Sequence, residues 1–213
     1  MDDIITIRRL ARKDWRLYRD MRLAALKNDP AVFCETHEEE AAKTEAEWRD
    51  MLSDRENGYL GMFDGRKMIG LAAIINNGGE FVWEKLFTNP GEIVRELFNA
   101  VSALGIVSAF SHAANNLNGS AAWLGEIYLD PQYRGRGLAK RLYEEGVKWA
   151  TTQLNLTELM ATVRESNGAS NKLIQKSGFR ELFRGACAWP DGKTENGIIY
   201  RLDLEQQRIE PKI

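Results

Sequence analysis

One stretch decides the fold of this chain: Gln132-Tyr133-Arg134-Gly135-Arg136-Gly137-Leu138-Ala139. It follows an apolar run at 123–129, which predicts a strand, and an Asp130-Pro131 turn. It leads into an amphipathic pattern that predicts a helix from about 138 to 152. Glycines let the backbone turn so that several N–H groups point at one place, where the helix dipole and two arginines add positive potential. This arrangement predicts a binding site for a pyrophosphate group.

Several kinds of loop bind pyrophosphate, and the spacing of the glycines separates them. A Walker loop ends in Lys-Ser or Lys-Thr after a longer glycine spacing, which this chain lacks. A dinucleotide-binding loop has a third small residue where this chain has Lys140, and it opens a βαβ unit near the start of its domain. An ordinary β–α turn with two glycines remains an alternative for Gly135 and Gly137 taken alone.

A second segment lies further along the chain and also follows a predicted strand, at 159–163. It reads Asn167-Gly-Ala-Ser170-Asn-Lys-Leu173-Ile174-Gln-Lys176-Ser-Gly178-Phe179. Together the two segments resemble the two signature motifs of the GNAT N-acetyltransferases, over roughly residues 4–204. The first resembles the family's Gln/Arg-x-x-Gly-x-Gly/Ala loop, and the second its Asn-x-x-Ala-x-x-Leu-Tyr-x-Lys-x-Gly-Phe segment. Ser170 stands where alanine is usual, and Ile174 stands where tyrosine is usual.

The resemblance implies acetyl-CoA as co-substrate and assigns the residues that hold it. The pyrophosphate would bind backbone N–H groups of the glycine loop, and the pantetheine arm would pair with a strand that separates from its neighbour. Asn167 would contact the same arm, or cap the helix that follows it, or do both. The implied cofactor-binding residues are Ile127, Tyr128, Leu129, Arg134, Gly135, Arg136, Gly137, Leu138, Ala139 and Asn167. An alternative for the two arginines is a solvated surface position.

The resemblance also suggests catalytic residues. Glu126 lies on the strand that would carry the thioester and is the candidate general base; the alternative is a solvent-facing charge. Ile174 cannot donate a proton to the leaving thiolate. The thiolate would then leave unaided or take a proton from water, or another residue would serve, for which Tyr128 and Ser170 are the candidates.

The acceptor site is expected in the segment after the first helix, residues 29–40 followed by Trp48. Its acidic side chains suit a cationic amine, and the alternative is a solvated acidic helix start. The expected acceptor is a small-molecule or peptide amine.

Composition narrows the class of protein. The chain has 213 residues, 44% of them hydrophobic, which favours one sizeable core, and a net charge of −2, which favours neither nucleic acid nor an anionic membrane as a partner. It has two cysteines, Cys34 and Cys187, in no metal-ligand spacing, and its N-terminus does not resemble a secretory signal. We therefore expect no metal, a cytoplasmic location with reduced thiols, and a monomer or homodimer.

The pattern of elements predicts an α/β fold. It indicates a single domain at about 4–206 with a mixed, mostly antiparallel sheet of six to seven strands and helices on both faces. Expected strands lie at 4–10, 59–63, 68–75, 122–129, 157–163, 179–186 and 196–204. The first helix is expected at about 14–27, with Asp14 as N-cap and an apolar face of Leu17, Met21, Leu23, Ala24 and Leu26. A second is expected at about 44–53.

An insertion at about 76–121 separates the third and fourth strands. Its apolar spacing predicts a helix at about 90–112, too interrupted by polar residues to span a membrane. Three roles are open for this helix: it is expected to pack on its own domain, to cover the acceptor cleft as a lid, or to form a dimer arm.

The sequence therefore predicts an acyltransferase that moves an acetyl group from acetyl-CoA to a primary amine by direct attack. A module of the same fold that binds acyl-CoA without turnover is the alternative, and Ile174 and the insertion favour it. A nucleotide-dependent transferase using the same loop is a third possibility.

Overall fold

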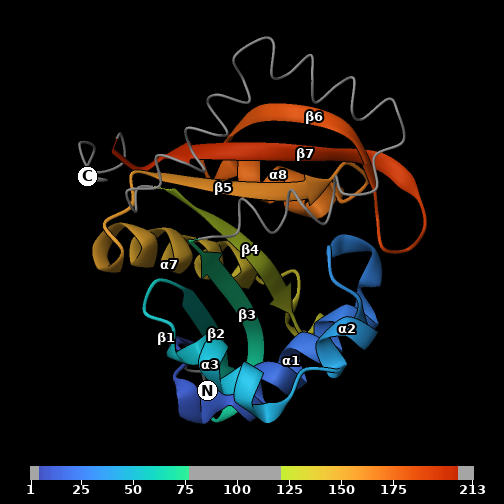
Figure 1. Ribbon diagram of the computed structural model, residues 1–213. Coiled ribbons are helices and arrows are strands. Elements are labelled where there is room, and N and C mark those ends of the chain that lie inside the picture. The colour runs from blue at the N-terminus through green and yellow to red at the C-terminus, as the bar shows by residue number, and fades with distance from the viewer. Residues whose placement is uncertain (1–4, 77–120, 206–213) are drawn as a thin grey trace.

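A seven-stranded sheet forms the centre of the computed structural model, which describes residues 5–76 and 121–205 (Figure 1). The strands are β1 (Ile5–Arg9), β2 (Gly58–Asp64), β3 (Lys67–Ile75), β4 (Ala121–Leu129), β5 (Glu158–Arg164), β6 (Arg180–Ala188) and β7 (Thr194–Asp203). Their spatial order is β1-β2-β3-β4-β5-β7-β6. Only β4 and β5 run parallel among these neighbours. The prediction of a mixed, mostly antiparallel sheet is confirmed.

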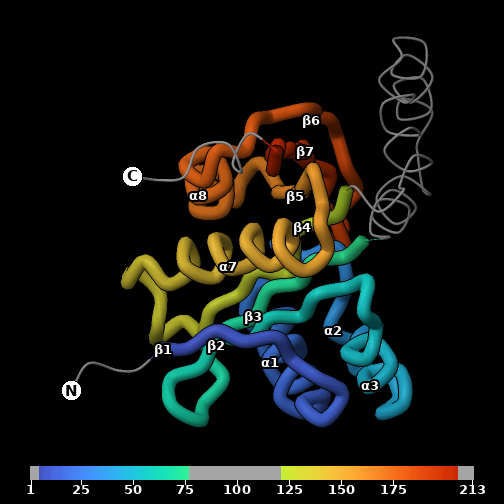
Figure 2. Tube along the Cα trace, turned by 90° about the vertical axis from the view of Figure 1, so that its left-hand side faces the viewer, coloured from blue at the N-terminus to red at the C-terminus, as the bar shows by residue number. Residues whose placement is uncertain are grey.

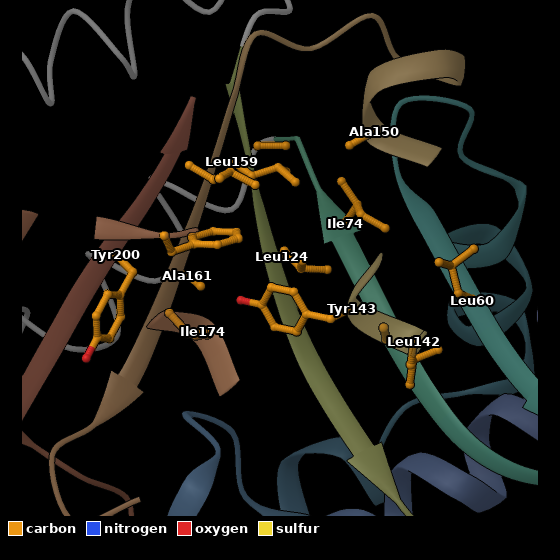
Figure 3. Close-up of a cluster of buried hydrophobic side chains, with 14 of the residues drawn as sticks. Leu60, Ile74, Leu124, Leu142, Tyr143, Ala150, Leu159, Ala161, Ile174 and Tyr200 are labelled. Carbon is orange, nitrogen blue, oxygen red and sulfur yellow. The ribbon is translucent and has the colours of Figure 1, made fainter. Parts of the chain in front are cut away.

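Helices cover both faces of the sheet (Figure 2). The helices of the described residues are α1 (Trp15–Asn28), α2 (His37–Ala41), α3 (Glu45–Ser53), α7 (Leu138–Gln153) and α8 (Gly168–Lys176), with 3₁₀ turns η1 (Arg12–Asp14), η2 (Pro30–Val32) and η3 (Pro131–Tyr133). One core lies under α7 and α8 and contains Leu60, Ile74 and Leu124 (Figure 3). The other lies under α1 and α3 and contains Tyr59 and Leu71. Neighbouring residues of β2 thus face opposite cores, as the two-residue period of a strand requires.

The face that α1 buries differs from the predicted one. Its buried residues are Trp15, Tyr18, Arg22, Ala25 and Leu26. Leu17, which the sequence places on the apolar face, is 41% exposed. The prediction relied on aliphatic residues and therefore placed the buried face wrongly. The face is occupied in part by the rings of Trp15 and Tyr18 and by Arg22, which pairs with carboxylates.

The start of α1 also differs from the prediction. The side chain of Asp14 makes no capping hydrogen bond to α1. Its carboxylate instead accepts hydrogen bonds from the Arg8 guanidinium, at 2.8 and 2.9 Å, and from the Ala11 N–H. Asp14 therefore ties η1 to β1, because a charged donor competes well with backbone N–H groups for the same carboxylate.

Gly70 on β3 allows its strand to lie close to β4. A Cβ atom at this position would lie 2.8 Å from the Tyr128 carbonyl oxygen and 2.6 Å from Leu129 Cδ2. We expect Gly70→Ala to lower the free energy of unfolding by about 1–3 kcal/mol, because a backbone atom would have to move. Thermal unfolding measures this. Gly168→Ala, where nothing lies within 4 Å of the added Cβ, is the control and should leave stability unchanged or raise it.

Some of the predicted features fall outside the described residues. These are the helix at about 90–112, nearly all of the insertion at about 76–121, and the domain limits at 4 and 206. Within the two described ranges, no helix is both long and apolar enough to cross a membrane. The same ranges contain no cluster of three histidine, cysteine or acidic side chains suited to a metal ion.

Candidate active site

Strands β4 and β5 separate along their length and open a gap in the middle of the sheet. Their pairing covers only Ala121–Trp123 opposite Glu158–Met160. The described residues show no further pairing between the two strands, so the β4 edge from residue 124 onward is left without a partner from β5. Unpaired backbone N–H and C=O groups within a sheet can bind an extended ligand as a strand would.

A β-bulge lies in β4 beside this gap. Gly125 is opposite Ala73, and Tyr128 is opposite Leu71, so Glu126 and Ile127 together face one residue of β3. Glu126 has a φ of 54°, in the left-handed region that non-glycine residues rarely adopt. The extra residue shifts the alternation of side chains, and Leu124 and Leu129 therefore both reach the core under α7.

The glycine loop joins β4 to α7, as predicted. Gly135 and Gly137 have φ values of 78° and 74°. A Cβ atom on either would meet nothing within 4 Å, so the glycines serve the backbone conformation and leave the space in front of them open. Gly137 is the N-cap of the 16-residue helix α7 and makes no side-chain capping bond. The first turn of α7 therefore presents N–H groups that an anion can bind.

The two arginines of the loop have different surroundings. The Arg134 Nε donates to the Leu129 carbonyl at 3.0 Å, and its guanidinium pairs with Asp29. The Asp29 carboxylate raises the pKa of Arg134, which fixes its charge. The Arg136 guanidinium lies over the Tyr133 ring, 5.3 Å from its centre, and forms no ion pair with any described residue. Arg136 is therefore the arginine of the pair whose charge is available to a ligand.

A narrow groove of 90 Å³ follows the gap between β4 and β5. Its walls come from β4, β5, α7 and α8, and from η2 and the residue after it. Two of the residues predicted to contact the co-substrate, Asn167 and Ile127, line it, and so do Glu126 and Ser170 of the catalytic candidates. Asn167 also caps α8, because its side-chain oxygen accepts from the Ser170 N–H at 3.2 Å.

A wider, open cavity of 530 Å³ meets the groove. The groove and the cavity share six lining residues, which are Val32, Phe33, Leu124, Gly125, Glu126 and Thr162. Among the described residues, the carboxylates on the cavity wall are those of Glu35, Glu40, Glu47, Asp50 and Glu126, and the one basic side chain is that of Lys43. Five residues of the predicted acceptor segment, Val32, Phe33, Cys34, Glu35 and Glu40, therefore line a cavity with an excess of negative charge, whereas Trp48 does not line it.

Glu126 lies where the two spaces meet, held by residues of α1. The Tyr18 hydroxyl donates a hydrogen bond to Glu126 Oε2, and Arg22 Nη2 lies 3.7 Å from Oε1. The Glu126 side chain is 19% exposed, whereas that of Arg22 is 1% exposed and also pairs with Glu35 at 2.7 Å. Glu126 is therefore a held, largely enclosed carboxylate, and the structure does not place it as a solvent-facing charge.

The surroundings of Glu126 act on its pKa in opposite directions. Burial raises the pKa above the ordinary value of a glutamate and is the largest cause. The charge of Arg22 and the Tyr18 hydrogen bond lower it, but they do not cancel the effect of burial. A carboxylate with a raised pKa accepts a proton more readily than an ordinary one, as a general base must.

Removing the Tyr18 hydroxyl should change the pH dependence of any reaction that needs ionised Glu126. Tyr18→Phe deletes a hydrogen bond that favours the carboxylate, so the pKa of Glu126 should rise further. We expect the acid limb of kcat/KM to move to higher pH, and a pH–rate profile measures it. An unmoved limb would mean that another group controls it. Arg19→Gln on the exposed side of α1 is the control and should leave the limb in place.

The other catalytic candidates take different positions. The Tyr128 hydroxyl accepts a hydrogen bond from the Asn28 side-chain amide at 2.8 Å, and the side chain packs in the core under α1. Tyr128 lines neither the groove nor the wider cavity. Ser170 and Ile174 both line the groove from α8, and Ile174 is buried there.

The residues of this site that the sequence-based prediction did not name include Tyr18, Arg22, Tyr143 and Thr162. Tyr18 and Arg22 are four residues apart on α1 and therefore share a face, which is the one signal that could have linked them. The hydroxyls of Tyr143 and Thr162 are buried without a hydrogen-bond partner in the described structure, and both residues line the groove. Their importance depends on the gap between β4 and β5, which the sequence does not encode locally.

Several solved structures have this fold. A spermidine N-acetyltransferase from Vibrio cholerae, in complex with CoA and spermine, has a TM-score of 0.64 and 17% identity, with 94% of this chain and 96% of that one covered. The putative acetyltransferase yncA from Salmonella typhimurium, with acetyl-CoA, has a TM-score of 0.64 and 14% identity, with 94% of each chain covered. A ribosomal-protein-S5-alanine acetyltransferase from Vibrio fischeri has a TM-score of 0.64 and 15% identity, with 97% and 96% covered.

Sequence comparison completes the assignment. A search of curated proteins gives no match. The model of the acetyltransferase (GNAT) family matches residues 19–179, from α1 to the Phe179 that ends the second motif. The match covers the glycine loop, the separated strands and Glu126, and it extends over most of the chain. The protein therefore belongs to the acetyltransferase (GNAT) family.

Proposed function

We propose that this protein transfers the acetyl group of acetyl-CoA to the primary amine of a small cationic acceptor, by direct attack of the amine. The observation that carries the proposal is the position of Glu126. Its carboxylate lines both the groove beside the unpaired β4 edge and the wider acidic cavity. A carboxylate between the groove for the thioester and the cavity for the amine can accept a proton from the amine as the acetyl group is transferred.

The groove and the glycine loop fit CoA. The open space before Gly135 and Gly137, the uncapped start of α7 and the Arg136 guanidinium suit a pyrophosphate. The unpaired edge of β4 suits the amide groups of pantetheine, with Ile127, Tyr128 and Leu129 as the backbone partners. The loop joins the end of β4 to the start of α7, and residues of both elements line the groove, so one extended molecule can occupy both. CoA-bound relatives of the same fold support this assignment.

The wider cavity favours an acceptor with more than one positive charge. Glu40 is 4% exposed, and its Oε1 accepts from Lys43 Nζ at 2.7 Å. Its Oε2 is buried without a partner among the described residues and is free to bind an ammonium group. Glu47 and Asp50 add negative charge on the same wall. A polyamine has the spaced ammonium groups that such a wall binds, and the spermidine acetyltransferase of this fold supports that class.

Glu126 accepts the proton that the amine loses as its nitrogen attacks the thioester carbonyl. Arg22 and Tyr18 hold the carboxylate in place through an ion pair and a hydrogen bond. An N–H group of the unpaired β4 edge, at 127–129, polarises the carbonyl. The enclosed position strengthens each of these interactions, because little water competes for them.

A module that binds acyl-CoA without turnover remains the second candidate. Ile174 favours it, because isoleucine at this position of the groove cannot donate a proton to a leaving thiolate. The two candidates share the CoA site and differ in whether thiol is released.

Thiol release separates them. The purified protein is incubated with acetyl-CoA and one candidate acceptor at a time. The acceptors are spermidine, a peptide with a free N-terminus, and a neutral amide that has no ammonium group. We expect release of free CoA in step with acetylation of spermidine, confirmed by mass spectrometry. Tight CoA binding by calorimetry without release on any amine would support the binding module instead.

A further inference from the structure

Tyr143, in the second turn of α7, has a buried hydroxyl group without a hydrogen-bond partner in the described part of the chain. The residue is 2% exposed, and its oxygen has no hydrogen-bond partner within the described parts of the chain. Its ring packs edge-on against Phe179, with 5.4 Å between ring centres. The hydroxyls of Tyr18 and Tyr200, also fully buried, donate to Glu126 and Asn171. An unsatisfied buried hydroxyl costs free energy, so Tyr143 calls for an explanation that its packing does not supply.

The Tyr143 hydroxyl faces the groove between the separated strands. Tyr143 lines this groove together with Ala161 of β5 and Ile174 of α8. Figure 3 shows the hydroxyl turned toward Ala161 and Ile174, across the gap between β4 and β5. It is therefore a donor directed into the space assigned to the pantetheine arm.

Two other hydroxyl groups line the groove, those of Thr162 and Ser170. The Thr162 hydroxyl also has no partner among the described residues, but Thr162 lines the wider acceptor cavity as well, whereas Tyr143 lines only the groove. Ile174 presents only carbon from α8. Ser170 lies one turn earlier on α8, and its side chain is only half-buried, so water can reach it. We propose that the Tyr143 hydroxyl donates a hydrogen bond to the sulfur of CoA as the thiolate leaves. This inference rests on the proposed acetyl transfer and adds to it a catalytic residue that comes from α7.

The step balances without any further reactant. The amine nitrogen forms the new C–N bond, its proton passes to Glu126, and the C–S electron pair moves to sulfur. Tyr143 keeps its proton and stabilises the negative charge on sulfur through the hydrogen bond. The thiolate later takes a proton from water, and Glu126 returns its proton to solvent.

The protonation state of Tyr143 agrees with this role. Burial raises the pKa of Tyr143 well above the ordinary value of a tyrosine, so the hydroxyl stays protonated and remains a donor at every working pH. The pKa of a free thiol such as that of CoA is about 8.5 in water. Among the described lining residues, Glu126 is the one with a charged side chain, and its carboxylate raises the pKa of a bound thiol in every variant compared below.

The test is the pKa of the thiol of bound CoA, measured by the ultraviolet absorbance of the thiolate as pH is varied, in the wild-type protein and in Tyr143→Phe. We expect the thiol pKa to be higher in the variant by about one unit. With spermidine as acceptor, kcat should fall roughly tenfold while KM for acetyl-CoA stays unchanged, because the bond strengthens as charge develops. Thermal stability should not fall, because the lost hydroxyl has no partner among residues 5–76 and 121–205.

Two further variants make the result specific. Tyr200→Phe removes a buried hydroxyl that has partners in Asn171 and Gln175, outside the groove lining. It should lower the melting temperature and leave the bound thiol pKa unchanged. An unchanged thiol pKa in Tyr143→Phe, or a shift seen in Ser170→Ala or Thr162→Val and not in Tyr143→Phe, would overturn the inference. Absence of CoA binding to the wild-type protein would overturn the proposed function itself, which calorimetry detects separately.

Discussion

Glu126→Gln is expected to lower kcat/KM for acetyl transfer by roughly 10²–10⁴-fold, the range for loss of a positioned general base. Glutamine has the shape of glutamate, but it cannot accept the proton of the attacking amine. The wild-type protein should be active only where Glu126 is ionised. Activity should therefore rise with pH through a pKa above the ordinary glutamate value, in the direction that burial sets. In Glu126→Gln this acid limb should disappear. Steady-state kinetics over a pH series measures both effects.

The variant should still fold and bind CoA, because the glycine loop lies outside the change. Glu45→Gln, a carboxylate on α3 that forms surface ion pairs with Arg49 and Arg16, is the matched control. Surface pairs of this kind contribute little to stability, so Glu45→Gln should keep both activity and the acid limb. If Glu126→Gln retained wild-type kcat/KM with CoA binding intact, Glu126 would not be the base.

Gly135→Glu is expected to weaken CoA binding by roughly a hundredfold, because two effects act together. Gly135 has a φ of 78°, which an L side chain adopts only at a cost of about 1–2 kcal/mol. The added carboxylate would also point into the open space before the loop, where the pyrophosphate is assigned, and would repel it. Isothermal titration calorimetry with CoA measures the loss.

Gly192→Glu separates these two effects. Gly192 lies in the turn between β6 and β7 and also has a φ of 78°, and a Cβ there would meet nothing within 4 Å. It should therefore lower the melting temperature about as much as Gly135→Glu does. CoA affinity should remain that of the wild-type protein. Equal CoA affinity in the two variants would show that the glycine loop is not part of the CoA site.

The sequence predicted most of the fold because its local signals agree with the tertiary structure. The Asp64-Gly65 turn gives the β2–β3 hairpin, and the glycine loop starts α7 at Leu138, as expected. The resemblance to the GNAT motifs also led to the correct family. These features depend on residues close together in the chain, where turn and helix preferences act directly.

The details of the site depend on contacts between distant residues, and there the sequence is a weaker guide. Nothing near Glu126 in the sequence indicates Tyr18, whose hydroxyl reaches it from α1, 108 residues earlier in the chain. The bulge that turns Glu126 inward arises from the register of β4 against β3. In the sequence, Tyr143 is indistinguishable from the other core residues of α7. Its hydroxyl faces a groove only because β4 and β5 separate.

The central claim is acetyl transfer to a cationic amine, and one measurement tests it most directly. Purified protein is given acetyl-CoA and spermidine, and free CoA and acetylated spermidine are both quantified over time. We predict that the two products form in equal amounts and that Glu126→Gln nearly abolishes both. Binding of acetyl-CoA without formation of either product, across spermidine and a panel of other amines, would contradict the account.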